Sequence, residues 1–70
     1  MTDEKMIHMA NQIAAFFDTQ SGNAPDAVAD HLLKFWEARM KEQLFAYVDK
    51  GGEGLKDSVI AAVAQIRQAA

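Results

Sequence analysis

Two histidines are the side chains in this sequence best suited to acid–base or metal chemistry. They are His8 and His31, and Asp30 directly precedes the second. A zinc site or a general acid–base pair needs several converging groups, and the spacing of the other polar residues supplies none. The chain has no cysteine, which excludes disulfides, thiolate metal sites and cysteine nucleophiles. We therefore predict no catalytic residue, no cofactor-binding residue and no metal ligand in this chain.

The glycine-rich stretch 51–54 is the second candidate for chemistry, because such loops can cradle phosphates. A phosphate-binding loop follows a strand and precedes a Lys-Ser or Lys-Thr pair, and this stretch has neither neighbour. Lys50 comes just before it, and a basic last turn followed by glycine is typical of a helix end. The stretch therefore predicts a helix stop and a turn.

The composition indicates a small helical protein. The chain has 70 residues, half of them hydrophobic, with one proline and a net charge of −3. This length suits one domain at most, near the size at which a single core becomes marginal. No apolar run approaches the ~20 residues that cross a bilayer, the N-terminus lacks the pattern of a signal peptide, and the basic residues form no stripe for nucleic acid. We expect a cytoplasmic, all-α protein that binds neither membrane nor nucleic acid.

The spacing of apolar residues predicts four short helices in a single domain over residues 1–70. We expect them at about residues 3–19, 24–36, 38–50 and 56–68. Thr2 and Asn23 are suitable N-caps, and Pro25 suits a first helical turn. The stripes of these helices give the expected core: Met6, Ala10, Ile13, Phe17, Val28, Leu32, Phe35, Trp36, Met40, Leu44, Val48, Leu55, Val59, Val63 and Ile66.

A phase slip in the apolar pattern predicts a break after the second helix. Carried along one axis at about 100° per residue, the stripe before Trp36 and the stripe after Met40 lie roughly 110° apart. One straight helix cannot bury both stripes in one core. We expect the chain to break near residues 37–39, with Trp36 at the corner.

Several large apolar side chains fall outside the simplest single core. Ile7, Phe16, Leu33, Phe45 and Ile60 are the clearest cases, and Met9 lies beside Phe16 on the predicted first helix. Methionine suits adaptable binding surfaces, and an apolar excess in so short a chain favours docking or self-association. The predicted partner-interface residues are Ile7, Met9, Phe16, Leu33, Phe45 and Ile60.

Three motifs, taken in order, are familiar from a known family. They are residues 9–17 (MANQIAAFF), His31 with residues 35–36 (FW) and 39–40 (RM), and residues 51–55 (GGEGL). Together they resemble the delta subunit of soluble NAD-dependent formate dehydrogenases, from about Ile7 to Leu55. The chain departs from that family's common Asp-Pro pairs, having Glu37-Ala38 and Lys56-Asp57 at these places. This leaves open whether the partner enzyme oxidises formate or a related substrate.

The resemblance implies a small subunit of a cytoplasmic molybdenum or tungsten enzyme. In that family the catalytic alpha subunit carries the pterin cofactor and iron–sulfur clusters, and other subunits handle FMN and NAD. The implied role is a non-catalytic accessory subunit that docks on the alpha subunit and supports its assembly or stability.

Two alternatives to a permanent subunit remain. One is a transient assembly chaperone that aids insertion of the molybdenum–pterin cofactor, and the other is a homodimeric helical scaffold. A cofactor binder needs a basic, concave patch, and its candidate residues are scattered along the sequence: Lys5, Lys34, Arg39, Lys41 and Arg67. Stoichiometric co-purification with the enzyme distinguishes the accessory subunit from both alternatives.

Overall fold

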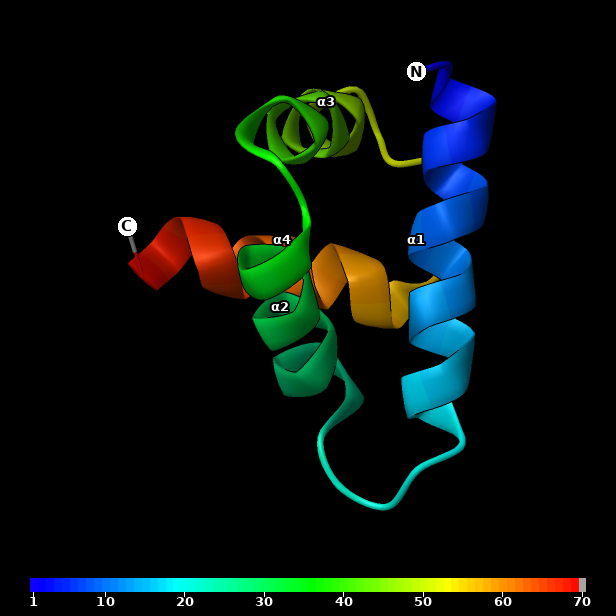
Figure 1. The fold of residues 1–70 in the computed structure, drawn as a ribbon, viewed down its shortest axis with the longest axis vertical. Coiled ribbons are helices and arrows are strands. Elements are labelled where there is room, and N and C mark those ends of the chain that lie inside the picture. The colour runs from blue at the N-terminus through cyan, green and yellow to red at the C-terminus, as the bar shows by residue number, and fades with distance from the viewer. Residues whose placement is uncertain (70) are drawn as a thin grey trace.

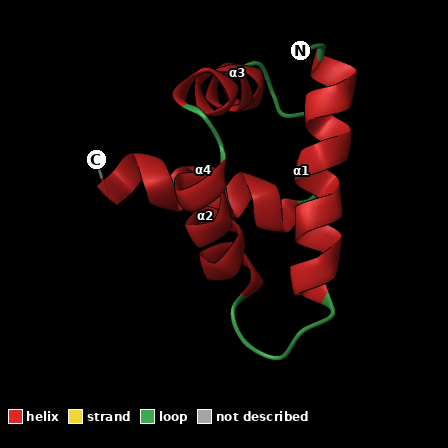
Figure 2. Ribbon diagram, viewed as in Figure 1, coloured by secondary structure: helices red, strands yellow, loops and turns green. Residues whose placement is uncertain are grey.

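The computed structural model describes residues 1–69, which form four α-helices joined by short connections (Figure 1). The helices are α1 (Asp3–Asp18), α2 (Ala24–Phe35), α3 (Ala38–Asp49) and α4 (Asp57–Ala69). No strand occurs in this part of the chain (Figure 2), so the all-α prediction is confirmed. The first three helices end one residue earlier than expected, and α4 is shifted by one residue toward the C-terminus.

Side-chain caps start the first two helices. The Thr2 hydroxyl accepts a hydrogen bond from the Lys5 N–H, and the Asn23 side-chain oxygen accepts one from the Asp26 N–H, both at 3.2 Å. Each cap satisfies a backbone donor that the first helical turn leaves free. Both N-caps were predicted, and both are confirmed.

The break between α2 and α3 consists of two extended residues. Trp36 (φ −89°, ψ 134°) and Glu37 (φ −65°, ψ 158°) leave the helical conformation, and α3 begins at Ala38. The break therefore starts one residue before the expected range of 37–39. Trp36 lies at the corner with 6% of its surface exposed, in contact with the core.

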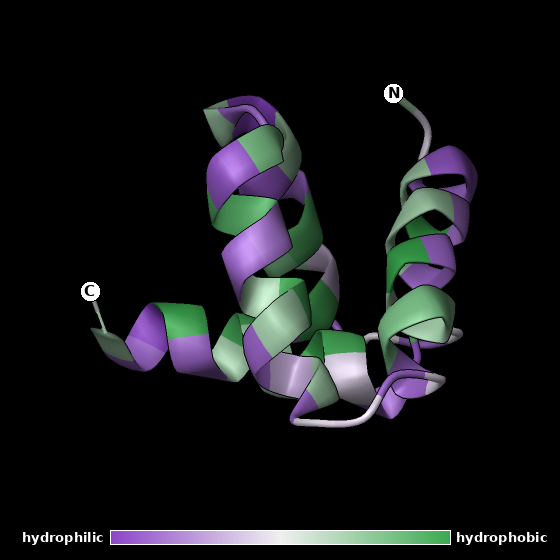
Figure 3. Ribbon diagram, turned by 60° about the horizontal axis from the view of Figure 1, so that its bottom comes forward, coloured by the Kyte–Doolittle hydropathy of each residue, from purple (hydrophilic) through white to green (hydrophobic). Residues whose placement is uncertain are grey.

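The helices enclose one core. α2 packs against α4, which runs across it in Figure 1, and α1 contacts each of the other three helices. Hydrophobic residues lie along the side of α1 that faces the rest of the molecule (Figure 3). The largest fully buried side chains come from all four helices: Met6, Val28, Leu32, Leu44, Val59 and Val63. Buried alanines complete the core: Ala10, Ala14, Ala29 and Ala62.

The structure corrects one of the expected core residues. Phe35 is 71% exposed, although it was assigned to the buried stripe. The buried series on α2 runs from Val28 to Leu32 and continues, at the same spacing of four, to Trp36. Phe35 therefore lies to one side of that series. Five other expected core residues are only partly buried, packed against the core: Ile13, Phe17, Met40, Val48 and Ile66.

Candidate docking site between α1 and α2

An apolar groove lies where α1 faces α2 and the start of α3. Two adjoining hollows form it, and they share Gln12, Ile13 and His31. We define the α1–α2 groove by all residues that line these hollows: Met9, Gln12, Ile13, Phe16, Phe17, His31, Phe35, Trp36 and Met40.

Helical spacing places these side chains on the two walls. Met9, Ile13 and Phe16 recur at intervals of three and four residues, which puts them on one side of α1. His31 and Phe35 are four residues apart and occupy one side of α2. The buried Trp36 and the partly buried Met40 join the groove to the core below.

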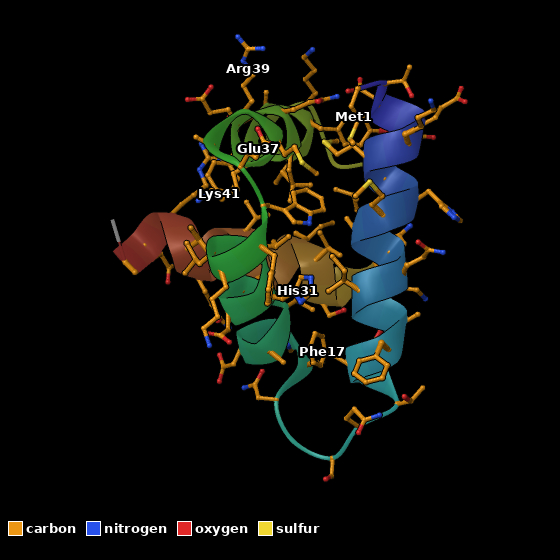
Figure 4. All side chains as sticks on the ribbon, viewed as in Figure 1. Met1, Phe17, His31, Glu37, Arg39 and Lys41 are labelled. Atoms are coloured by element: carbon orange, nitrogen blue, oxygen red, sulfur yellow. The ribbon has the colours of Figure 1, made fainter. Side chains whose placement is uncertain are left out.

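A row of aromatic rings crosses the groove. The ring centroids of Phe16 and Phe17 are 5.2 Å apart, those of Phe17 and His31 are 6.2 Å apart, and those of His31 and Phe35 are 4.8 Å apart. Figure 4 shows Phe17 and His31 in the space between α1 and α2. The first two pairs meet edge to face, an arrangement that aromatic rings prefer. The rings at the two ends of the row are exposed to solvent, Phe16 to 60% and Phe35 to 71%.

The groove lining carries no Asp, Glu, Lys or Arg. Aromatic residues and methionine make up much of it, and His31 is its titratable group. Cores of protein–protein interfaces are enriched in aromatic residues and methionine and depleted of charge. The composition of this groove is therefore typical of an interface core.

The other flank of α1 is closed by the segment that joins α3 to α4. The Asn11 side-chain amide donates to the Gly54 carbonyl at 2.8 Å, and its oxygen accepts from the Lys56 N–H at 2.9 Å. The Tyr47 hydroxyl donates to the Glu53 carbonyl at 2.7 Å. Asn11 therefore has two backbone partners from a segment more than 40 residues further along the chain.

The glycine-rich stretch ends α3, as predicted. The Gly51 N–H donates to the Val48 carbonyl at 3.0 Å, and the Gly52 N–H donates to the Tyr47 carbonyl at 3.1 Å. This pair of bonds is the Schellman motif, which needs a left-handed residue after the helix. Gly51 and Gly52 both have positive φ, at 121° and 64°. The stretch is therefore a helix stop and turn.

The predicted interface residues do not gather at one place. Met9 and Phe16 line the groove. Leu33 is 55% exposed and lines a separate hollow with residues of α4. The other three are partly buried against the core, which corrects the view that they fall outside it: Ile7, Phe45 and Ile60. Gln12, His31 and Phe35 were not among the predicted interface residues, although the spacing of His31 and Phe35 on one helix side was a usable signal.

An ion pair between α3 and α4 produces the clearest pKa shifts in the molecule. The Arg67 guanidinium donates to both carboxylate oxygens of Asp49, at 2.6 and 3.1 Å. These hydrogen bonds, with the charge attraction, lower the pKa of Asp49 and raise the pKa of Arg67. The Arg67 guanidinium carbon also lies 5.6 Å from the centre of the Phe45 ring. Both charged groups are exposed, and the pair joins two helix ends away from the groove lining.

The basic residues considered for a cofactor lie on separate elements. Lys34 pairs with Asp30 on α2 at 3.1 Å, and Arg67 of α4 pairs with Asp49. Arg39 and Lys41 belong to α3 (Figure 4), and Lys5 belongs to α1. Across residues 1–69, no three His, Cys, Asp or Glu side chains are grouped to hold a metal ion. None of the helices described here is both long and apolar enough to span a membrane.

Comparison with models of known protein families gives a match over most of the chain. The family model described as NADH-dependent formate dehydrogenase delta subunit FdsD matches residues 5–63. That range contains all of α2 and α3 and every residue of the groove lining. The chain has no significant match among curated proteins.

Proposed function

This chain belongs to the family of NADH-dependent formate dehydrogenase delta subunits, and we propose that it is a non-catalytic accessory subunit that docks on the catalytic alpha subunit. In this proposal the pterin cofactor, iron–sulfur clusters, FMN and NAD all lie in other subunits, and the complex is cytoplasmic. Its role is to support assembly or stability of the catalytic subunit. The observation that carries the proposal is the uncharged aromatic groove between α1 and α2.

Covering the exposed rings of Phe16 and Phe35 would stabilise a complex with a partner. Phe16 and Phe35 are 60% and 71% exposed, so a partner that covers them removes much of two phenylalanine side chains from water. Covering each ring contributes about 1–2 kcal/mol, given the transfer free energy of a fully buried phenylalanine. No charged side chain in the lining has to be desolvated for this gain.

The supporting role follows from selective binding. A subunit that binds the folded, assembly-competent form of the catalytic subunit stabilises that form over its alternatives. Binding shifts such an equilibrium only by the difference in affinity for the two forms. A docking subunit therefore needs no reactive group of its own to raise the yield of active enzyme.

The test is a binding measurement with purified catalytic subunit and the full-length chain. We compare wild type with the double variant Phe16→Ser/Phe35→Ser, and use Leu33→Ser as the matched control, because Leu33 is 55% exposed outside the groove. The double variant should bind about 30–1,000-fold more weakly, since two anchors of about 1–2 kcal/mol each together contribute about 2–4 kcal/mol. Leu33→Ser should bind as wild type does.

The same experiment distinguishes the alternatives. Equal affinity of wild type and the double variant would contradict docking through the groove. Binding only to catalytic subunit that lacks its pterin cofactor would favour the transient chaperone. Self-association of the chain, without binding to the catalytic subunit, would favour the homodimeric scaffold. Deletion of the gene in the host, followed by an assay of formate-dependent NAD reduction, measures the effect on active enzyme.

A further inference from the structure

We infer that the α1–α2 groove receives an amphipathic helix of the partner subunit, lying alongside α1. The inference rests on the proposed function and adds the kind of element that the partner presents. Four features of the described residues support it: the length of the hollowed strip along α1 and, in the groove at its centre, the lack of main-chain partners, the spacing of the walls and the lack of charge.

The hollowed strip follows α1 along its whole length. A hollow near the N-terminus, lined by Met1, Glu4, Lys5 and His8, shares Met9 with the groove. At the other end, a hollow over the α1–α2 connection shares Phe16 and Phe17 with it. Since α1 has 16 residues, the strip is about 24 Å long at 1.5 Å per residue. It can hold four turns of a second helix.

The walls of the α1–α2 groove offer few hydrogen-bond partners to an extended peptide. Residues 1–69 contain no strand, so the groove has no sheet edge to which a peptide could add. Gln12, His31 and Trp36 provide the nitrogen and oxygen atoms among the lining side chains. An extended segment would bury backbone N–H and C=O groups against a lining with few partners, at a cost of about 1–3 kcal/mol for each unpaired group. A helix satisfies its own backbone groups and avoids this cost.

The side chains of α1 recur at the spacing of another helix. Met9, Ile13 and Phe16 lie about one turn apart, which is ~5.4 Å along the axis. Side chains on one face of a second helix recur at the same interval, so they can alternate with those of α1 along the strip. Side chains on one face of a strand recur every ~6.6 Å, and they lose register with α1 after two or three contacts.

The lack of charge in the groove and the area that a stable interface buries define the occupant further. The α1–α2 groove, the central part of the strip, is lined without Asp, Glu, Lys or Arg, so the bound helix needs an apolar face there, because a charge in the groove would lose its water without gaining a partner. A helix about 10 Å wide covers only a narrow strip, whereas a stable interface buries about 800 Å² on each partner. A larger subunit that inserts a helix and also contacts the rims of the groove meets both needs.

Site-specific photo-crosslinking tests the inference in the complex of this chain with purified catalytic subunit. p-Benzoylphenylalanine is placed, one position at a time, at His8, Gln12 and Phe16, which are exposed and lie four residues apart on α1. Phe35 probes the opposite wall, and Leu33 is the control on the same helix outside the groove. Crosslinked residues are identified by mass spectrometry.

A bound helix predicts one pattern of crosslinks. The contacted residues should lie on a single segment of the catalytic subunit and shift by three or four residues for each step along α1. Phe35 should reach the same segment, and Leu33 should not. Hydrogen exchange on the catalytic subunit is a second readout that needs no altered side chain, and it should show one segment of about four turns becoming protected when this chain binds.

Other outcomes overturn the inference, and they separate it from the proposed function. A shift of two residues for each step indicates an extended segment, and crosslinks scattered over several segments indicate a flat contact. Either result, in an intact complex, overturns the helix while the accessory-subunit proposal stands. Crosslinks only to a second copy of this chain, or no complex at all, overturn both.

Discussion

Side chains on the two flanks of α1 differ in how far they are buried. On one flank, Ile7 is partly buried and Asn11 holds the backbone of the α3–α4 connection by two hydrogen bonds. On the other flank, Phe16 and the facing Phe35 remain more than half exposed. We refer to these as the closed flank and the open flank. The difference shows that large apolar side chains of this sequence divide into two groups, since some are covered by the chain's own segments and others stay exposed.

Two adjacent aromatic residues give the largest expected contrast between groove surface and core. Trp36→Ala should lower the free energy of unfolding by about 3–5 kcal/mol, because it empties a buried site beneath the open flank. Phe35→Ala should change it by no more than about 0.5 kcal/mol, because that ring is 71% exposed. Urea denaturation of the two variants measures both. Equal losses would mean that Phe35 belongs to the core after all.

Two adjacent amides compare the flanks directly. Asn11→Ala removes both hydrogen bonds to the connection before α4, and should cost about 2 kcal/mol of unfolding free energy at roughly 1 kcal/mol per bond. Gln12→Ala, one residue along α1 and exposed in the open flank, should cost less than about 0.5 kcal/mol. Thermal unfolding followed by circular dichroism compares them. If the order of the two losses is reversed, the closed flank is not held by Asn11.

A smaller effect is expected where the closed flank meets α4. Gly52 is buried with φ of +64°, and a Cβ there would lie 3.4 Å from the Ile60 Cδ1 atom. Gly52→Ala should destabilise the protein by about 1–2 kcal/mol, the cost of a left-handed conformation for a residue other than glycine. Glu53→Ala is the control, because its side chain is exposed and its backbone carbonyl still accepts from Tyr47. Equal stability of both variants would show that this turn tolerates a side chain.

The smallest effect concerns charge, at the ion pair of α3 and α4. Hydrogen bonds from Arg67 lower the pKa of Asp49 below its ordinary value in the folded state. The stabilisation from the pair is therefore complete above the ordinary carboxyl pKa and is lost as the pH falls through the lowered one. Both groups are exposed, so salt should weaken the effect. Carboxyl NMR titration should show a low Asp49 midpoint that rises in Arg67→Gln; an unchanged midpoint in that variant would falsify the assignment of the cause.

Local signals made the fold predictable. The N-caps at Thr2 and Asn23 and the turn at residues 51–54 depend on residues close in sequence, and the apolar spacing located each helix to within about a residue. The break at Trp36 followed from a phase slip alone. Phe35 was assigned to the core because it lies three residues after the buried Leu32, and spacings of three and four residues both fit one helical stripe. Only the packed structure shows that Trp36, four residues after Leu32, is buried while Phe35 is exposed.

The two flanks were less predictable, because they depend on contacts between distant residues. Asn11 and Gln12 both lie on the polar side of a predicted helix, and no nearby residue distinguishes them. Asn11 differs only because Gly54 and Lys56 fold onto it. Ile60 is likewise partly buried because it packs close to Gly52, eight residues earlier in the chain. The groove forms only where α1 and α2 pack side by side, and the sequence did not predict this pairing. Of the residues that line the groove, only Met9 and Phe16 were therefore predicted to be at a partner interface.

The two hydrogen bonds from Asn11 to Gly54 and Lys56 also affect how long the native state persists. These two bonds join residues 43 and 45 positions apart, so they form only after most of the chain has come together. Closing so long a loop costs entropy before either bond is made. We therefore expect these two hydrogen bonds to form late in folding. Interactions formed after the transition state slow unfolding and leave the folding rate unchanged. We therefore expect the two hydrogen bonds of Asn11 to slow unfolding, so that the kinetic lifetime of the native state depends on the flank opposite to the one proposed for docking.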